Sequence, residues 1–483
     1  MSLAGLLALG LGSQFTATAP AQEPIIYQLK YAAPGADRVE VVLTLPSLPP
    51  GPRILVMPRA IPMGYGEQPY DRFLSEIRAF GSTAEPLPVV RQGEAPRWTV
   101  GGPENQVRRI EYRVDVSRME REIYSAADCS KVRPDYLGLL GYSVFAFLEG
   151  QEEAPLALEV LAPQDWPVLL TLSPTLPAPI SRAGARAPNF YALADSQVVM
   201  GPGLSLYRLE ATVPLFVAIY AEGQVDAEGL GKLALEALER VIAYFGGAPF
   251  PHYTLHQELL RPLSERHRYG FSMEHLSSGT FYLAADEGIT ASSSETDRAR
   301  TRYNFAHHMA HAWIPKRSYG KGYYPFTWEL APVLDSIWFS EGFAQYAALE
   351  ALATGLPAAQ AASFRERMLE ARFRRALAEA PAFIRRMSLV ELSQVASTRY
   401  SEDFRTGRNV FSRGGLMAAE MDEHIRRASG GEKSLRDALR HLVAWSERSR
   451  RAFRIEELPV LFSMATGVDT RDILNRWLKP LEE

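Results

Sequence analysis

The sequence predicts an α+β protein with more than one domain, in which a β-rich N-terminal part precedes a thermolysin-like part that ends in helices. Three observations lead to this class. The chain has 483 residues, too many for one hydrophobic core. Apolar and polar residues alternate with a period of two in the first third, as in half-buried strands. Beyond about residue 300, apolar residues recur instead at helical spacing.

The N-terminal part, residues 24–175, is expected to be a β-sandwich-like domain. Segments such as "RVEVVLTLPSL" (38–48), "RRIEYRVDVS" (108–117) and "PLALEVLAP" (155–163) alternate between Pro- and Gly-rich turns. The segment "APQDWPVLLTLSP" closes this region. A domain boundary is therefore expected near residue 175.

Residues 176–483 are expected to form the second domain, with strands first and helices from about residue 300. The apolar run "LFVAIYAEG" (215–223) reads as a strand. The segment 227–247 reads as an amphipathic helix, because its apolar residues fall at helical spacing and Gly246-Gly247 supply a stop. Helical periodicity then continues through "LRDALRHLVAWSERSR" (435–450) to the end.

The N-terminus resembles a secretory signal peptide. An apolar run at 3–12 leads to Ala19-Pro20-Ala21, a small-x-small cleavage pattern, although the usual basic residues are missing. A disordered tail is the alternative. The run is too short to span a bilayer and no later segment is long enough, so no integral membrane segment is expected. The protein is therefore expected to be exported, periplasmic or secreted.

Composition argues against a nucleic-acid partner and against disulfides or cysteine-based metal sites. Hydrophobic residues make up 47% and charged residues 22%, which is typical of a globular protein. A net charge of −4 without a basic run gives no reason to expect nucleic acid. The single cysteine, Cys129, excludes an internal disulfide framework and a cysteine-based metal cluster, and we expect it to be a small buried residue.

Histidines gather in one part of the chain. Seven of the nine lie within about sixty residues. Such a cluster indicates a site only if its spacing suits a ligand. The seven are His252, His256, His267, His275, His307, His308 and His311.

The spacing of His307 and His311 suits a metal ion. On an α-helix, residues four apart project from one face about one turn apart, so two imidazoles can reach one ion. Thirty residues further on, "SIWFSEGFAQYAALEAL" places Glu341 among aromatic residues on a second helix. A carboxylate seldom enters such surroundings unpaired, and a metal would give it a partner. An arginine-paired glutamate is the alternative interpretation.

Several further segments make the chain resemble a known family. "IEYRVDV", "LERVIAYFGGAPFPHY", "YGFSMEHLSSGTF", "AHHMAHAW", "IWFSEGFAQY" and "SRGGLMAAEMD" appear in the order and spacing of the glycyl aminopeptidase family. These gluzincin zinc metallopeptidases are relatives of the larger thermolysin-like aminopeptidases. The resemblance runs from about residue 105 to the end. It implies a β-rich domain followed by a thermolysin-like catalytic domain; the PDZ module that many members carry is not expected here.

The resemblance also implies roles for individual residues. His307, His311 and Glu341 match the three ligands of one zinc ion. Glu274, in "YGFSMEHLSS", matches the glutamate that accepts the free α-amino group of a peptide substrate. A carboxylate at the end of a cleft can bind an ammonium group by charge-assisted hydrogen bonds. Peptides or protein N-termini would then be the ligands, although Glu274 can also be read as an ordinary solvated carboxylate.

Two positions depart from the family pattern, and both are catalytic. The family has a glutamate general base next to the first histidine, and here that residue is His308. Many members have a tyrosine whose hydroxyl faces the oxyanion, and here the aligned residue is Phe411. A general base contributes roughly 10²- to 10⁴-fold and one oxyanion donor about 10²- to 10³-fold. Tyr400 and Tyr303 are nearby residues that could replace the lost hydroxyl.

Four interpretations follow from these residues. The first is a zinc-binding protein of a peptidase family with a degenerate active site and weak or no peptidase activity. The second is an active zinc aminopeptidase that uses His308 or another base. The third is a metal-free peptide-binding or scaffolding protein. The last is another metal and reaction, since two histidines and a carboxylate also hold non-haem iron.

Overall fold

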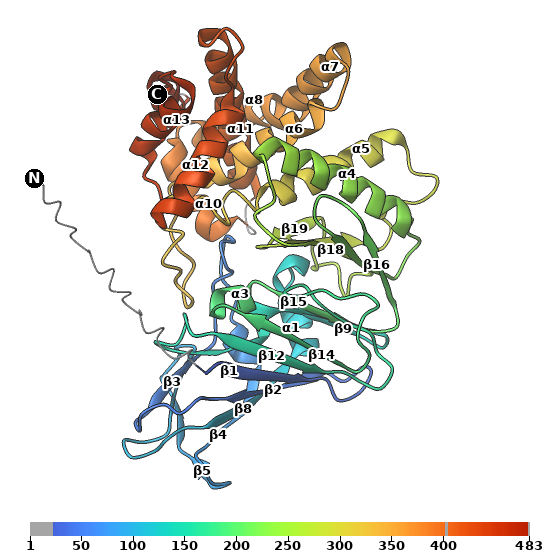
Figure 1. Ribbon diagram of the computed structural model, residues 1–483, viewed down its shortest axis with the longest axis vertical. Coiled ribbons are helices and arrows are strands. Elements are labelled where there is room, and N and C mark those ends of the chain that lie inside the picture. Colours follow the sequence, from blue (N-terminus) through green and yellow to red (C-terminus); the bar gives the residue numbers. More distant parts are fainter. Residues whose placement is uncertain (1–22, 401–403, 482–483) are drawn as a thin grey trace, which may run out of the picture.

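The computed structural model describes residues 23–400 and 404–481. A β-rich N-terminal part forms one end of the molecule, and helices of the C-terminal part form the other (Figure 1). The predicted α+β class with this order of domains is confirmed. The expected signal peptide at residues 1–21 lies outside the described residues.

The largest sheet of the N-terminal part has seven strands in the order β14-β12-β1-β2-β8-β4-β5. Its strands alternate buried and exposed residues, so one face of the sheet covers the core of this domain. The strands are β1 (Ile25–Lys30), β2 (Arg38–Thr44), β4 (Leu74–Phe80), β5 (Pro86–Leu87), β8 (Arg109–Asp115), β12 (Leu156–Leu161) and β14 (Arg182–Ala187).

Two four-stranded sheets complete the β-rich part, in the orders β13-β15-β10-β9 and β11-β3-β7-β6. Their strands are β3 (Arg53–Val56), β6 (Val89–Arg91), β7 (Arg97–Val100), β9 (Lys131–Arg133), β10 (Tyr136–Leu140), β11 (Phe147–Leu148), β13 (Val168–Leu170) and β15 (Gln197–Met200). Short helical segments connect them: η1 (Tyr70–Phe73), α1 (Val116–Glu122), η2 (Ala126–Asp128), α2 (Gly141–Val144) and α3 (Phe190–Ala194).

The β-rich part extends further than the sequence predicted. Strands β14 and β15 lie beyond residue 175, yet β14 pairs with β12 and β15 pairs with β10. The N-terminal part therefore continues to Met200 rather than ending near residue 175. The reason is the composition of β14: "RAGARA" alternates Ala with Arg and Gly but has no β-branched, aromatic or large apolar residue, so its strand signal is weak.

The second part begins with a five-stranded sheet in the order β16-β17-β18-β20-β19. Its central strands β17 and β18 are buried along almost their whole length, because they pair in parallel and are covered on both faces. The strands are β16 (Leu204–Leu209), β17 (Leu215–Ala221), β18 (Tyr253–Leu260), β19 (Phe271–Glu274) and β20 (Ser278–Ala284).

Helices build the rest of this part. Helix α4 (Ala227–Phe245) starts at the N-cap Asp226 and ends at Gly246, where φ is +86°, as the sequence predicted for 227–247. It packs against α5, α6 and α12. The helical elements that follow are α5 (Glu295–Ala310), η3 (Trp338–Phe343), α6 (Ala344–Ala353), α7 (Ala358–Met368), η4 (Leu369–Arg374), α8 (Arg375–Ala378), α9 (Ala382–Arg385), α10 (Leu389–Arg399), α11 (Phe404–Ala428), α12 (Leu435–Ser449), η5 (Ile455–Glu457), α13 (Leu458–Thr466) and α14 (Arg471–Leu478).

Buried polar groups hold the two parts together. Lys131 on β9 forms an ion pair with Glu258 on β18 at 3.0 Å, and both side chains are almost fully buried. Tyr136 on β10 donates to the same carboxylate at 2.6 Å and stacks on Tyr220 of β17 at 4.2 Å. Satisfied buried networks of this kind favour one arrangement of the elements that carry them. Across the described ranges, the helices are each too short or too polar to cross a membrane.

Candidate metal centre

The centre is built on α5. Ser294 caps this helix, since its side chain accepts a hydrogen bond from the Asp297 backbone N–H. The last turn carries His307 and His308, and His311 is the C-cap residue. His307 and His311 face the core, whereas His308 is half-buried beside them.

The hydrogen bonding of His311 leaves one ring nitrogen available for a metal. Its Nδ1 lies 2.8 Å from the Ile314 carbonyl oxygen, which accepts hydrogen bonds only, so Nδ1 carries the proton. Its Nε2 is buried and has no hydrogen-bond partner within residues 23–400 and 404–481. A metal-ligating histidine usually has this arrangement, with one nitrogen held by a carbonyl and the other free.

Glu341 comes to the same point from η3, a π-helical turn. Such turns occur frequently at functional sites. Glu341 Oε2 lies 3.4 Å from His307 Nε2 and 3.4 Å from His311 Nε2. Its other oxygen, Oε1, accepts a hydrogen bond of 2.8 Å from the Tyr65 hydroxyl. Glu341 Oε2 is therefore close to both imidazoles, while the groups of described residues whose ligand atoms all lie within 4.8 Å of one another are His307, His308 and His311, and Glu274, His311 and Glu341.

The chemistry of these donors fits a divalent cation such as zinc. The buried Nε2 atoms of His307 and His311 have no hydrogen-bond partner in the described residues, and such orphaned groups need an explanation. Two imidazole nitrogens and one carboxylate oxygen form a common zinc-ligand set. No arginine pairs with Glu341 among the ion pairs of the described residues, which argues against the structural reading of that residue.

The local electrostatics also favour a cation. Burial, together with the neighbouring His311, lowers the pKa of His307 to about 3, so this imidazole is neutral. Burial acts to lower the pKa of His311 as well, but the carboxylates of Glu274 and Glu341 raise it to about 9. Burial would raise the pKa of Glu341, yet the adjacent imidazoles hold it well below its usual range. The carboxylates thus favour positive charge at this point.

His308 lies against Glu274. Its Nδ1 is 3.7 Å from Glu274 Oε2, an ion-pair distance rather than a hydrogen bond. Burial would raise the pKa of Glu274, but His311 and the contact with His308 lower it to about 2. Ligand atoms of His307, His308 and His311 all lie within 4.8 Å of one another; His307 and His308 line the same pocket, and His311 is buried behind them.

Of the two tyrosines that could replace the hydroxyl missing at position 411, the structure places only one in the pocket. Phe411 is half-buried, and its ring centroid is 6.5 Å from that of His307 and 5.7 Å from that of Tyr400. Tyr400 lines the same pocket. The hydroxyl of Tyr303 instead donates to the Gln345 carbonyl oxygen, and Tyr303 itself does not line the pocket. Of these two tyrosines, Tyr400 is therefore the one that could contact a molecule bound in the pocket.

A pocket of about 240 Å³ surrounds these side chains. Both parts of the chain line it, because Tyr65 and Asp128 come from the β-rich part. Sequence reasoning did not single out these two residues or Arg372, which also lines the pocket. The only signal for Tyr65 is its place between Gly64 and Gly66 in a long Pro- and Gly-rich loop.

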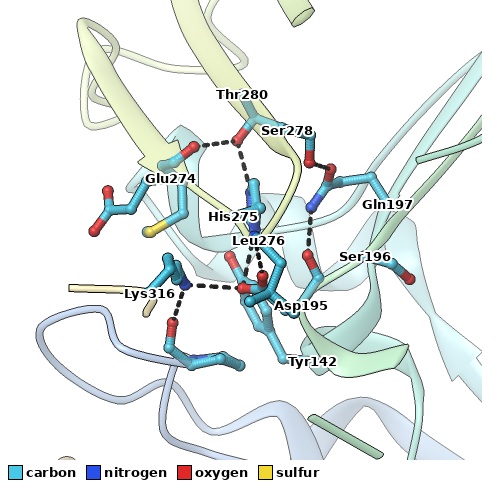
Figure 2. A network of polar contacts seen from close by, with 12 residues as sticks. Tyr142, Asp195, Ser196, Gln197, Glu274, His275, Leu276, Ser278, Thr280 and Lys316 are labelled. Carbon is cyan, nitrogen blue, oxygen red and sulfur yellow. Dashed lines mark hydrogen bonds and ion pairs between the residues drawn. The ribbon is translucent and has the colours of Figure 1, made fainter. Parts of the chain in front are cut away.

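A buried network positions Glu274 (Figure 2). Asp195, at the end of α3, accepts hydrogen bonds from the Leu276 backbone N–H at 2.6 Å and from Lys316 Nζ at 2.9 Å. His275, next to Glu274, contacts the same carboxylate at 3.3 Å. Lys316 lies five residues after His311 and also donates to the Pro62 carbonyl oxygen. The network therefore ties the β-rich part to both the Glu274 turn and the segment after α5.

Solved structures share this fold. An aminopeptidase N family protein from Idiomarina loihiensis superposes with a TM-score of 0.82 at 20% identity, over 95% of this chain and 76% of that chain. The M1 zinc metallopeptidase from Deinococcus radiodurans gives a TM-score of 0.54 at 17% identity, over 96% of this chain and 95% of that chain. A mutant of the latter, solved with a Tyr-Ser-Ala substrate, gives 0.54 at 16% identity over the same shares.

At these identities the similarity shows the fold of this chain. More particularly, residues 26–202 match the family described as the Peptidase M61 N-terminal domain. The match ends just after β15, which agrees with the extent of the β-rich part in the structure. A search of curated proteins found no match.

Proposed function

We propose that this protein is a zinc-binding metallopeptidase-family protein, resembling glycyl aminopeptidases, that binds peptides and cleaves them weakly or not at all. One observation carries the proposal: Glu341 Oε2 lies 3.4 Å from both His307 Nε2 and His311 Nε2. The resemblance adds that His308 and Phe411 align with the base and the oxyanion donor of the family. The Deinococcus relative binds a peptide substrate, which supports peptides as the ligand class.

His307 Nε2, His311 Nε2 and Glu341 Oε2 are the atoms that would hold the ion. Zinc, when bound, supplies a Lewis acid for the scissile carbonyl and favours ionisation of water. The Tyr65 hydroxyl would orient Glu341 through its hydrogen bond to Oε1, and the Ile314 carbonyl oxygen would orient His311 through Nδ1. Glu274, at the β19 end of the pocket, would accept the α-amino group of a peptide.

The residues present explain why cleavage should be weak. In a peptidase the base takes a proton from the attacking water and returns it to the leaving amine. An imidazole at position 308 is a poor carrier for the return step, because its protonated form is disfavoured beside a dication. Phe411 has no hydrogen-bond donor for the oxyanion. If the two losses multiplied, turnover would fall by some 10⁴- to 10⁷-fold, although such effects are rarely additive.

A second candidate, an active zinc aminopeptidase, rests on Tyr400. This tyrosine lines the pocket next to Phe411, and its hydroxyl would be the replacement donor. In that case Tyr400→Phe would lower the turnover of wild type by about 10²-fold or more. In the impaired protein it would change little.

The test combines metal analysis with kinetics. Purified protein should contain about one zinc per chain, and His307→Ala should lose it; a metal-free protein would favour the scaffolding interpretation. Amino-acid p-nitroanilides should be hydrolysed slowly or not at all, with or without added zinc. His308→Glu should then raise hydrolysis at unchanged zinc content, and adding Phe411→Tyr should raise it further, because base and donor act in one transition state. Full activity in wild type, unimproved by His308→Glu, would overturn the proposal.

We also propose that the protein is exported to the periplasm or secreted, on the basis of the apolar run and small-x-small pattern in residues 1–21. N-terminal sequencing of the protein from a periplasmic or culture fraction should begin near Gln22. A mature chain that keeps residues 1–21 in the cytoplasmic fraction would contradict export.

A further inference from the structure

The pocket contains a second polar group beside the proposed metal position. Asn304 lies three residues before His307 on α5, and Gln345 lies four residues after Glu341 at the start of α6. One helical turn rises about 5.4 Å, so each amide is placed about one turn from a proposed ligand. Both residues line the same pocket. The Tyr303 hydroxyl, hydrogen-bonded to the Gln345 carbonyl oxygen at 3.1 Å, holds the two helices together here.

A guanidinium group completes this end of the pocket. Arg372 on η4 donates from Nη2 to Asn304 Oδ1 at 3.1 Å, and its guanidinium carbon lies 5.1 Å from the centre of the Tyr303 ring. These contacts fix the orientation of the side chain but use only one of its five donors. The stacked, half-buried group also lines the pocket.

Within residues 23–400 and 404–481, Arg372 has no ion pair with a carboxylate; the same holds for the exposed Arg367 and Arg375, but unlike them Arg372 is half-buried and lines the pocket. Arg365 pairs with Glu350 at 2.6 Å, and Arg374 pairs with Glu366. Among residues 23–400 and 404–481, no carboxylate lies within ion-pair distance of Arg372. A guanidinium that lines a pocket, is held in place by neutral groups and lacks a counter-charge is suited to bind a carboxylate from a ligand.

Glu274 lines the same pocket, but its surroundings differ from those of Arg372. Glu274, the residue suited to an ammonium group, already has the imidazole of His308 at 3.7 Å. The replacement of an acidic residue by histidine at position 308 also removes one negative charge from the pocket. A carboxylate of the ligand therefore meets less repulsion in this pocket, while its α-amino group can still bind at Glu274.

We propose that Arg372, with Asn304 and Gln345, binds a carboxylate of the peptide ligand about one helical turn from the metal position. The inference rests on the proposed function, because it assumes a peptide in this pocket. Two sources have the required chemistry: an acidic side chain and the C-terminal carboxylate of a short peptide. Arg372 is then a specificity-determining residue of the site.

The experiment measures binding, so it does not depend on catalysis. Four tripeptides are titrated into the zinc-loaded full chain by calorimetry: Ala-Ala-Ala, its C-terminal amide, Ala-Glu-Ala amide and Ala-Gln-Ala amide. The first pair tests a C-terminal carboxylate and the second pair an acidic side chain. At least one charged probe should bind about 10- to 100-fold more tightly than its neutral partner.

Variants then assign the effect to Arg372. Arg372→Met keeps an aliphatic stem against Tyr303 and should abolish the difference within the pair, with zinc content and neutral-probe affinity unchanged. Arg372→Lys should keep part of the difference. The matched control Arg375→Met changes an exposed arginine that does not line the pocket, and it should behave as wild type.

The outcomes separate this inference from the proposed function. Equal affinity within both pairs, or a difference that survives Arg372→Met, overturns the inference while peptide binding itself stands. A zinc-loaded wild type that binds none of the four peptides overturns the peptide-binding function, and this inference with it.

Discussion

Gly414 on α11 is the point at which that helix touches the backbone of η3. A Cβ atom added to Gly414 would lie 2.0 Å from the Trp338 carbonyl oxygen and 3.1 Å from Gly342 Cα. A Cβ on Gly342 would in turn lie 2.4 Å from the carbonyl carbon of Gly414. The two helical segments therefore cross with their backbones in contact, and this crossing places Phe411 beside Glu341.

The Gly414→Ala substitution should force the two backbones apart. Real Cβ atoms essentially never approach another atom closer than 3.0 Å, so a contact of 2.0 Å requires a displacement of about 1 Å. Overpacking of a core costs about 1 to 3 kcal/mol, and backbone atoms on both sides favour the upper end. Alanine regains about 1 kcal/mol of helix propensity, which leaves a net loss of about 2 kcal/mol.

The same displacement should weaken metal binding. Glu341 lies in η3, three residues after Trp338, and ligand distances in a metal site are defined to about 0.2 Å. Thermal unfolding should show a fall in Tm of about 2 to 4 °C, because a chain of 483 residues has a larger unfolding entropy than a small domain. Competition with a chromophoric chelator should show a zinc affinity at least about 10-fold weaker.

Gly415→Ala is the matched control for this prediction. It brings the same gain in helix propensity on the same helix, but its Cβ would meet the ring of Phe373, at 2.8 Å, rather than backbone. A side chain can move, so this variant should lose about 1 kcal/mol or less and keep its zinc affinity. A Gly414→Ala protein with wild-type Tm and zinc affinity would refute the reasoning.

Two further predictions concern residues from the β-rich part. Burial acts to raise the pKa of Asp195, but Lys316 and His275 lower it overall, so its ionised form stabilises the fold above its unfolded pKa of about 3.9 and this stability is lost as pH falls below that value. Asp195→Asn should destabilise the protein at pH 7 by about 3 to 5 kcal/mol and should weaken the fall of Tm at acidic pH. An unchanged acidic part of the Tm–pH curve would contradict this. Tyr65→Phe removes the hydrogen bond to Glu341 and should weaken zinc binding about 10- to 100-fold in a chelator competition, with little change in Tm of the zinc-free protein; unchanged affinity would show that the hydroxyl does not orient the ligand.

The features that could be predicted from the sequence are those set by local spacing. His307 and His311 are one helical turn apart, and Glu341 is conspicuous as a carboxylate in an aromatic helix, so their meeting point could be inferred. Helix α4 could be predicted with its ends, because both its periodicity and its stop signal are local. Strand β14 could not, because its pairing with β12 is set by position in the sheet and not by its own apolar pattern.

The residues that sequence reasoning missed reach the site through tertiary contacts. Arg372 lies 61 positions beyond His311 in a segment full of arginines, and only the packing of η4 against α5 distinguishes it. Tyr65 comes from a loop 276 positions before Glu341. The sequence around Arg372 or Tyr65 has no periodicity that indicates a binding residue, because the packing of other elements brings these two side chains to the site.

The β-rich part is therefore a structural component of the candidate centre and not an appended module. Tyr65 supplies a hydrogen bond to a proposed zinc ligand, and Asp195 holds the segments that carry Glu274 and follow His311. Lys131 and Glu258 form their ion pair in the interface with almost no exposure, and Tyr136 donates to the same carboxylate. These buried groups are satisfied only when the two parts are docked in this position, so they favour this arrangement over others. Because docking of the two parts also sets the position of Tyr65, a change that weakens their interface should also disturb the geometry of the metal centre.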